Sequence, residues 1–146
     1  MKLKPILLLA ALITAATAHE FEHHKDWLKA PEGLAHVGDS HGEIDVDSKG
    51  NFYVSIVGGE KSGIQVYSHE GKYLRNLPNA RNNHHGFTMV QEDGKDIIYA
   101  ACLKDEKSAF LKLSTEGEIL MEIPMTAIPE EVGKKFALTH ADRAPN

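Results

Sequence analysis

His41-Gly42-Glu43-Ile44-Asp45-Val46 returns 44 positions later as His85-Gly86-Phe87-Thr88-Met89-Val90, with histidine, glycine and valine in the same places. After two inserted residues, Asp96-Ile97, the match continues at an offset of 46 positions. It then aligns Tyr53 with Tyr99, Glu60-Lys61-Ser62 with Glu106-Lys107-Ser108, and Ser68-x-Glu70-Gly71 with Ser114-x-Glu116-Gly117. Self-similarity at a fixed period of this length indicates a repeat architecture. We therefore interpret the chain as two copies of one structural unit.

Each copy divides into four short runs rich in Val, Ile, Tyr and Phe, separated by Gly, Asn and Ser. Such runs between turn residues predict β-strands joined by hairpins. The predicted strands are residues 43–47, 52–57, 63–68 and 73–77 in the first copy, and 87–91, 97–103, 109–114 and 118–123 in the second. Four short strands in about 45 residues make one blade of a β-propeller. The expected fold class is all-β, with two complete four-stranded antiparallel blades.

Composition agrees with an ordinary globular protein. The chain has 146 residues, of which 42% are hydrophobic and 25% are charged, and this excludes disordered and collagen-like classes. Its single cysteine, Cys102, cannot form an internal disulfide, so a disulfide-framework class is excluded as well. The formal net charge is −5, which argues against a nucleic acid or an anionic membrane as partner.

The first eighteen residues are typical of a secretory signal peptide. Lys2 and Lys4 give a positive start, residues 6–13 form a short apolar run, and Ala16-Thr17-Ala18 supplies small residues for cleavage before His19. An uncleaved membrane anchor is the alternative. Cleavage would place the protein in the periplasm or outside the cell, without stable membrane insertion, and would remove two positive charges, leaving a net charge of −7.

The remaining chain divides into a lead-in (residues 19–38), two blades (39–81 and 82–126), and a connector with the start of a third blade (127–146). Pro129 and the acidic residues after it predict a short helix in that connector. Residues 138–146 resemble the opening strand and turn of another blade. Propellers close with four to eight blades. We therefore expect the sequence to be the N-terminal part of a longer propeller; a ring assembled from several copies is the alternative.

The first copy resembles an NHL repeat of the six-bladed β-propeller superfamily in two stretches, Asp45-Val46-Asp47-Ser48-Lys49-Gly50-Asn51-Phe52-Tyr53-Val54 and Gly63-Ile64-Gln65-Val66-Tyr67-Ser68-His69-Glu70-Gly71-Lys72. Within that superfamily, the His-Gly openings and the tail Leu138-Thr139-His140 with Ala144-Pro145-Asn146 are similar to the catalytic domain of peptidylglycine amidating lyase. In that family, histidines from different blades hold a central zinc ion, with calcium as a structural companion. The resemblance implies His85, His41 and His140 as metal ligands, whereas the arginine and tyrosine that the lyase needs cannot be assigned here.

The histidines can also be interpreted without a metal ion. His41 and His85 can cap strand ends through hydrogen bonds to the backbone, and the lead-in histidines 19, 23 and 24 are typical of a solvated segment. His84 should point to the face opposite His85 because neighbouring strand residues alternate, which predicts a supporting or solvent-exposed position. Cys102 lies in an apolar run and is expected to be a buried small residue rather than a nucleophile. Trp27 and Leu28 are expected to pack the lead-in against the side of the propeller.

These features predict a secreted or periplasmic propeller with a divalent metal ion, expected to be zinc, in its central channel. Such a site would serve a lyase or a hydrolase acting on a small-molecule or peptide ligand. The alternative is a non-catalytic propeller that binds a peptide, a glycan or a partner protein. The two functions differ in whether the protein depends on a metal.

Overall fold

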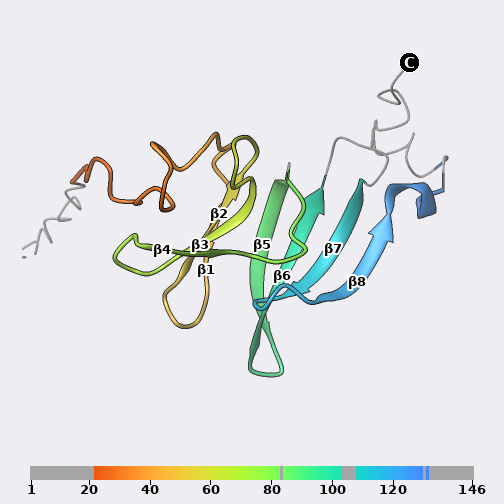
Figure 1. The fold of residues 1–146 in the computed structure, drawn as a ribbon. Helices are drawn as coiled ribbons and strands as arrows, with labels where there is room; N and C mark the ends of the chain where they lie inside the picture. Colours follow the sequence, from red (N-terminus) through yellow and green to blue (C-terminus); the bar gives the residue numbers. More distant parts are fainter. Residues whose placement is uncertain (1–21, 83, 103–107, 130, 132–146) are drawn as a thin grey trace, which may run out of the picture.

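The computed structural model describes residues 22–82, 84–102, 108–129 and 131, and it is all-β in this part of the chain. Two four-stranded antiparallel sheets stand side by side (Figure 1), and in each the strand order follows the chain. Sheet 1 contains β1 (Ile44–Val46), β2 (Phe52–Ile56), β3 (Gly63–Tyr67) and β4 (Tyr73–Asn76). Sheet 2 contains β5 (His84–Glu92), β6 (Lys95–Cys102), β7 (Ala109–Ser114) and β8 (Ile119–Pro124), which a short 3-10 turn follows at Met125–Ala127.

The strands are joined by turns that the local sequence specifies. Between β1 and β2, the buried Asp47 carboxylate accepts hydrogen bonds from the backbone N–H groups of Lys49 and Asn51, at 2.9 and 2.8 Å, and from the Asn51 side chain at 2.8 Å. Between β5 and β6 only Asp93 and Gly94 form the loop, and both have positive φ, of 49° and 74°. This is the two-residue hairpin turn that Asp-Gly favours.

The core lies between the two sheets. In each sheet, face A is the side that packs against the part of the chain preceding that sheet, which is the lead-in for sheet 1 and sheet 1 for sheet 2. Face B is the opposite side. Face B of sheet 1 packs on face A of sheet 2. The packed residues are Tyr53, Ile64, Val66 and Leu77 from sheet 1, and Ile98, Ala100, Cys102, Ala109, Leu111 and Leu113 from sheet 2. The period-2 alternation of a strand explains this division, since Ile98, Ala100 and Cys102 share one side of β6.

The lead-in covers the middle of face A of sheet 1. Trp27 meets the ring of Phe52 edge-on at 4.8 Å between centroids, and Leu28 and Val37 pack on the cluster of Val54, Ile56 and Tyr67. The Lys29 N–H group donates a hydrogen bond to the Gly71 carbonyl at 2.8 Å. The expectation that Trp27 and Leu28 pack the lead-in against the strands that follow is therefore confirmed, and the strands that they contact are those of sheet 1.

The same docking contact occurs twice. Gly71 and Gly117 occupy equivalent turns between the last two strands of their sheets, with φ of 80° and 84°. Gly71 lies against the carbonyl of Trp27, whereas Gly117 lies against the carbonyl of Pro78 and accepts a hydrogen bond from the Asn79 side chain at 2.8 Å. In both places a Cβ atom would collide with the backbone of the earlier segment. Each sheet thus uses a glycine turn to receive the segment that precedes it.

The eight predicted strands are all present, β1–β4 within residues 39–81 and β5–β8 within 82–126. The sheets do not close into a ring in the described part of the chain, so the propeller stays a prediction. The expected signal peptide, most of the expected helix after Pro129 and the expected third blade fall outside the described residues. Where the structure is described, no helix is long and apolar enough to cross a membrane.

Candidate functional site

The first strands of the two sheets lie next to each other. The Met89 N–H group on β5 donates a hydrogen bond to Asp45 Oδ2 on β1 at 2.6 Å, and the Thr88 hydroxyl donates to the same oxygen at 3.3 Å. Asp45 and Met89 are equivalent positions of the repeat, 44 residues apart. The contact therefore brings matching points of the two copies together.

The beginnings of β1 and β5 are also close together. The Ser55 N–H group donates a hydrogen bond to the Glu43 carbonyl at 3.0 Å, and the Ser55 hydroxyl donates to the His84 carbonyl at 3.4 Å. Together with the contact at Asp45, this shows that both strands start at the same end of the molecule. The two His-Gly pairs, at 41–42 and 85–86, therefore lie at one shared end.

The three histidines predicted as metal ligands differ in what the structure shows. His41 is exposed and lies just before β1. The backbone of His85 forms the second residue of β5, next to an irregularity in the pairing with β6 between His84 and Phe87. His140 lies outside the described residues. The structure thus brings the backbone positions of His41 and His85 to one end and leaves His140 as a prediction.

His84 is not solvent-exposed, and that part of the prediction is wrong. Its side chain is 0% exposed, with the Cys102 sulfur 3.3 Å from Nδ1. Burial lowers the pKa of the His84 imidazole to about 4, although a hydrogen bond with the backbone of Arg81 and the nearby charge of Glu43 both act in the opposite direction. The cause of this position is the register, because His84 pairs directly with Cys102 on face A of sheet 2.

The contact between His84 and Cys102 has the composition of a catalytic thiol and its base, but both residues are buried between the sheets. A neutral imidazole beside a buried thiol packs as part of the core and does not form the ion pair of a reactive cysteine. The prediction that Cys102 is a buried small residue is confirmed. The sequence pattern did not predict this pair. One extra residue near the start of β5 changes which residues of β5 lie opposite those of β6.

The predicted metal site was compared with the donor side chains that the structure describes. Within residues 22–82, 84–102, 108–129 and 131, no group of three His, Cys, Asp or Glu side chains could hold a metal ion. Zinc in proteins binds three or four such ligands. A zinc site with His41 and His85 as ligands would therefore need at least one further donor.

A hollow of about 340 Å³ opens at the same end of sheet 1. It is lined by residues 33–38 of the lead-in and by residues 59–61 of the loop between β2 and β3. The backbone bridge between Asp39 and Gly58 joins these two segments two residues before His41. The hollow therefore lies beside the chain that leads into the candidate site.

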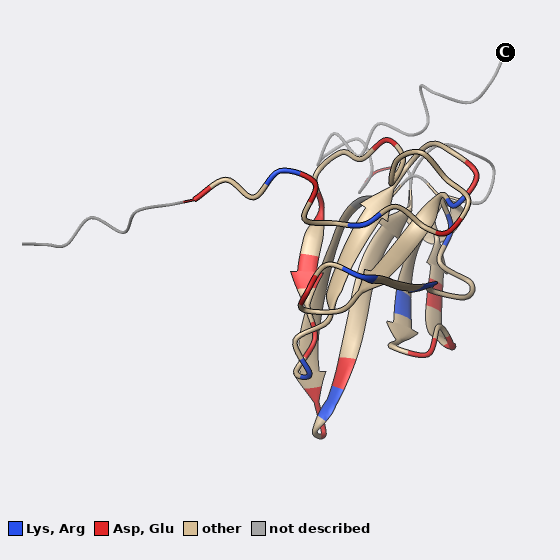
Figure 2. Ribbon diagram, turned by 60° about the vertical axis from the view of Figure 1, so that its left-hand side comes forward, with Lys and Arg blue, Asp and Glu red and all other residues tan. Residues whose placement is uncertain are grey.

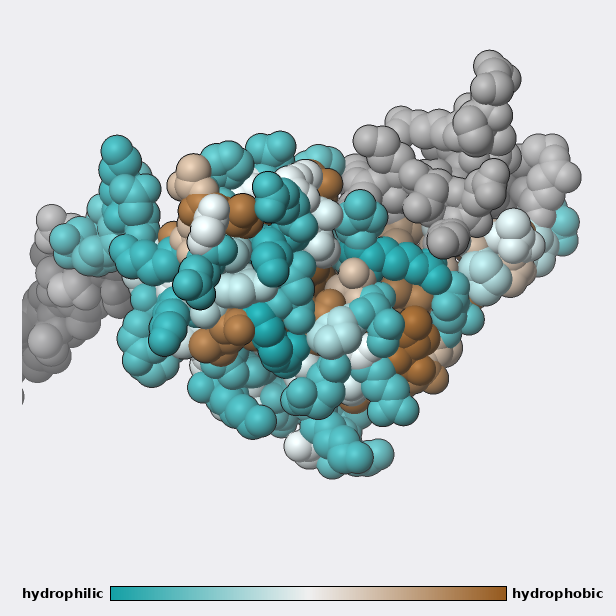
Figure 3. All heavy atoms as spheres, in the orientation of Figure 1, coloured by the Kyte–Doolittle hydropathy of each residue, from teal (hydrophilic) through white to brown (hydrophobic). Residues whose placement is uncertain are grey.

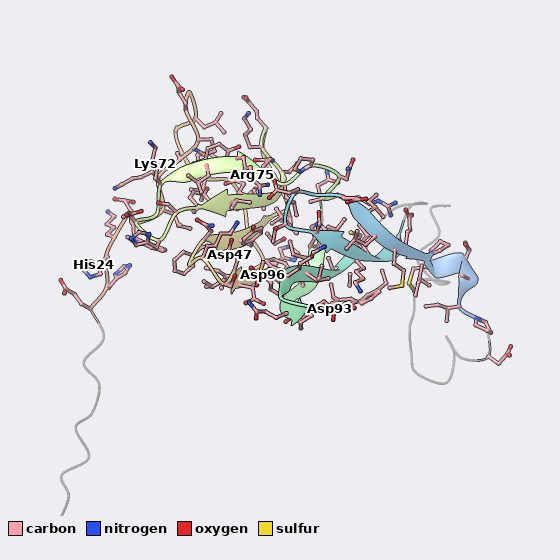
Figure 4. The ribbon with its side chains drawn as sticks, turned by 90° about the horizontal axis from the view of Figure 1, so that it is seen from below. His24, Asp47, Lys72, Arg75, Asp93 and Asp96 are labelled. Atoms are coloured by element: carbon pink, nitrogen blue, oxygen red, sulfur yellow. The ribbon has the colours of Figure 1, made fainter. Side chains whose placement is uncertain are left out.

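The opposite end of the molecule carries the turn between β1 and β2 and the turn between β5 and β6, with the acidic residues Asp47, Asp93 and Asp96 (Figure 4). The Ser48 hydroxyl and N–H group both donate to Asp96 Oδ2, at 2.6 and 3.1 Å, and so link the first turn of sheet 1 to β6. Asp47 is occupied by its own turn, as described above. These carboxylates hold turns and the contact between the sheets together. In the view of Figure 2, acidic and basic residues are interspersed over the strands and loops.

Comparisons of the chain with protein-family models, with curated proteins and with solved structures found no match.

Proposed function

We propose that the chain forms two neighbouring blades of an NHL-type β-propeller and binds a divalent metal ion, zinc by preference, through His41 and His85. The observation that carries this proposal is the 2.6 Å hydrogen bond between Met89 and Asp45, which sets equivalent positions of the two repeats side by side. In a propeller the first strand of each blade lines the central channel. Histidines at the start of such strands would converge on one point there.

The packing of the sheets also supports the propeller. Sheet 1 and sheet 2 stack in chain order, face B of the first on face A of the second, and their first strands, β1 and β5, lie next to each other. Neutral imidazoles suit zinc as ligands. His41 is exposed, so an ion could reach it without the fold opening. His140 is the further ligand that the resemblance to peptidylglycine amidating lyase implies.

When bound, zinc supplies Lewis-acid polarisation of a substrate oxygen or activation of a water molecule. This chemistry would serve a lyase or hydrolase acting on a small-molecule or peptide ligand outside the cytoplasm. The protein itself would contribute the two histidine ligands, and the packed sheets would hold the strands that carry them in place. The exported location rests on the predicted signal peptide in residues 1–18.

The test measures zinc affinity of the purified protein, beginning at His19, by competition with a chromophoric chelator. We expect His41→Ala and His85→Ala each to weaken zinc binding at least 10–100-fold, since even outer-sphere changes produce effects of that size. His69→Ala is the matched control, because His69 is exposed in the turn between β3 and β4 at the other end of sheet 1. Equal affinity in all four proteins would refute metal binding at this site.

The hollow beside Asp39 favours a second candidate function, metal-independent binding of a small ligand or peptide. Its volume of about 340 Å³ lies at the lower end of the range of ligand pockets. A lysine and a glutamate on its rim, Lys61 and Glu60, would contact polar groups of such a ligand. Ligand binding that persists in the presence of EDTA and in His41→Ala would favour this function over the first.

A further inference from the structure

Glu43, just before β1, carries a carboxylate oxygen that is enclosed by the protein. Hydrophilic side chains cover much of the face of the molecule that Figure 3 shows, where water can satisfy their polar groups. Oε2 of Glu43 is buried instead, and it has no hydrogen-bond partner. A charged oxygen in this state costs free energy, because it has lost its contact with water and gained no donor in exchange. Such an oxygen favours the binding of a cation.

The Glu43 side chain lies on the face of sheet 1 that packs on sheet 2. The Ser55 N–H group donates a hydrogen bond to the Glu43 carbonyl at 3.0 Å, so these two residues lie opposite each other. Opposite residues of neighbouring strands share a face of the sheet. Ser55 belongs to face B, because its hydroxyl donates to the His84 carbonyl on β5 at 3.4 Å. Glu43 therefore also extends from face B, toward the beginning of β5.

The carboxylate is near the two histidines that open β5. Burial is the largest influence on the pKa of the His84 imidazole and lowers it, while the charge of Glu43 acts in the opposite direction. The His84 ring itself lies against the Cys102 sulfur, 3.3 Å from Nδ1, and is not a partner of Oε2. The next residue on β5 is His85, and Glu43 stands only two residues after His41. The carboxylate is thus close in the chain to one proposed ligand and close in space to the strand that carries the other.

Glu43 also supplies the kind of donor that two imidazoles leave wanting. Zinc in proteins takes three or four ligands, and a carboxylate oxygen is one of its usual ligands. The negative charge of the carboxylate would offset part of the charge of the ion, which two neutral imidazoles cannot do. Two histidines and one glutamate are a ligand set of catalytic zinc sites, which keep one position open for water or substrate.

We propose that Glu43 is a ligand of the zinc ion, together with His41 and His85. This inference rests on the function proposed above and adds to it a residue that the sequence pattern did not identify. It does not depend on whether His140 also binds the ion. The buried Oε2 would gain a cationic partner, and the site would hold the ion between the approach to β1 and the start of β5.

The test measures zinc affinity by competition with a chromophoric chelator, with the protein beginning at His19. Glu43→Gln keeps the size of the side chain and removes its charge. It should weaken zinc binding at least about 10-fold, since outer-sphere changes alone have effects of that size. Glu70→Gln is the matched control, because it removes the same charge from an exposed side chain in the turn between β3 and β4. Its zinc affinity should equal that of the unaltered protein.

A second measurement separates a ligand from a residue that only supports the fold. Urea denaturation gives the stability of each protein with and without zinc. Without zinc, Glu43→Gln should be at least as stable as the unaltered protein, because a buried neutral amide costs less than a buried unpartnered charge. With zinc in excess, the unaltered protein should gain more stability than Glu43→Gln does, because it binds the ion more tightly.

The outcomes distinguish this inference from the proposed function. Weaker zinc binding in His41→Ala and His85→Ala, with unchanged binding in Glu43→Gln, would overturn the inference and leave the proposed function standing. Unchanged binding in all three variants would refute both. Equal weakening in Glu43→Gln and Glu70→Gln would overturn the inference, because the effect would then come from the overall charge. A Glu43→Gln protein that is less stable without zinc but gains as much from it would assign Glu43 to the fold alone.

Discussion

Replacing Gly117 with alanine should destabilise the protein much more than replacing Gly94, although both glycines have a left-handed backbone. Their φ angles are 84° and 74°, so alanine meets the same backbone strain of about 1–2 kcal/mol at either position. The surroundings differ. A Cβ atom at Gly94 would have no atom within 4 Å, whereas at Gly117 it would collide with the carbonyl and ring of Pro78. The difference between the two variants therefore measures the docking of the connector.

The magnitude follows from the contacts that must open when Pro78 moves away. The Asn79 side chain would lose its 2.8 Å hydrogen bond to the Gly117 carbonyl, which is worth about 1 kcal/mol. The Arg75 guanidinium would lose its 2.6 Å hydrogen bond to the Thr115 carbonyl, worth about 1.5–3 kcal/mol for a charged donor. We expect Gly117→Ala to lower the free energy of unfolding by about 2–4 kcal/mol more than Gly94→Ala does.

Urea denaturation followed by tryptophan fluorescence measures this difference. Trp27 is the single tryptophan, and it lies on the far face of sheet 1, away from both substitutions. Its signal therefore reports unfolding of the stacked pair of sheets and not a local change at the turn. Equal unfolding free energies for the two variants would show that the glycine contact with Pro78 contributes nothing to stability, and would refute the docking argument.

Three further results are expected. His84 has a folded-state pKa of about 4, below the ordinary value of 6.5, so the unfolded chain takes up the proton first as the pH falls. The free energy of unfolding of the metal-free protein should therefore fall by up to about 3 kcal/mol between pH 6.5 and 4. Urea denaturation at a series of pH values should show a smaller fall in His84→Leu, and an equal fall in the two proteins would contradict this assignment. Asp47→Ala should cost about 2–4 kcal/mol, because the buried carboxylate satisfies several donors of the first turn; Asp93→Ala, at the two-residue turn of sheet 2, should cost less, and a larger loss there would contradict the assignment. Leu111→Ala should cost about 2–5 kcal/mol by opening a cavity between the sheets; if thermal unfolding shows a loss below about 1 kcal/mol, the interface is not the core.

The strands were accessible to sequence reasoning because both signals that define them are local. β-branched and aromatic residues alternate along each run, and turn residues bound it. The prediction for residues 109–114 coincides with β7. β5 starts three residues earlier than predicted, at His84, because pairing with Cys102 extends the strand through polar residues. A strand end that depends on a partner strand cannot be read from the apolar pattern of its own residues.

The candidate site was predicted only in part for a similar reason. The repeat offset that aligns His41 with His85 also aligns Asp45 with Met89, and the structure shows the latter two in contact. The sequence therefore contained the information that the two openings meet at one end. The burial of His84 against Cys102 was missed, because one extra residue at an irregular pairing changes which side of the strand a residue occupies.

The coverage of face A of sheet 1 depends on tertiary contacts alone. Trp27 could be expected to pack on an apolar surface, but nothing in its neighbourhood says which of two similar sheet faces it covers. The contact of its carbonyl with Gly71 fixes that choice, and the equivalent contact of Pro78 with Gly117 repeats it. Equivalent turns of a repeat can therefore carry a docking role that neither turn displays by itself.

The proposal that His41 and His85 bind one metal ion together is tested most directly by a zinc titration of the metal-free protein, followed by nuclear magnetic resonance of the histidine rings. Resonances are assigned with the single histidine variants. We predict that the ring signals of His41 and His85 change together and saturate at one zinc ion per chain, while those of His69 do not change. Signals of His41 and His85 that stay constant, or zinc effects confined to the lead-in histidines His23 and His24, would contradict the account.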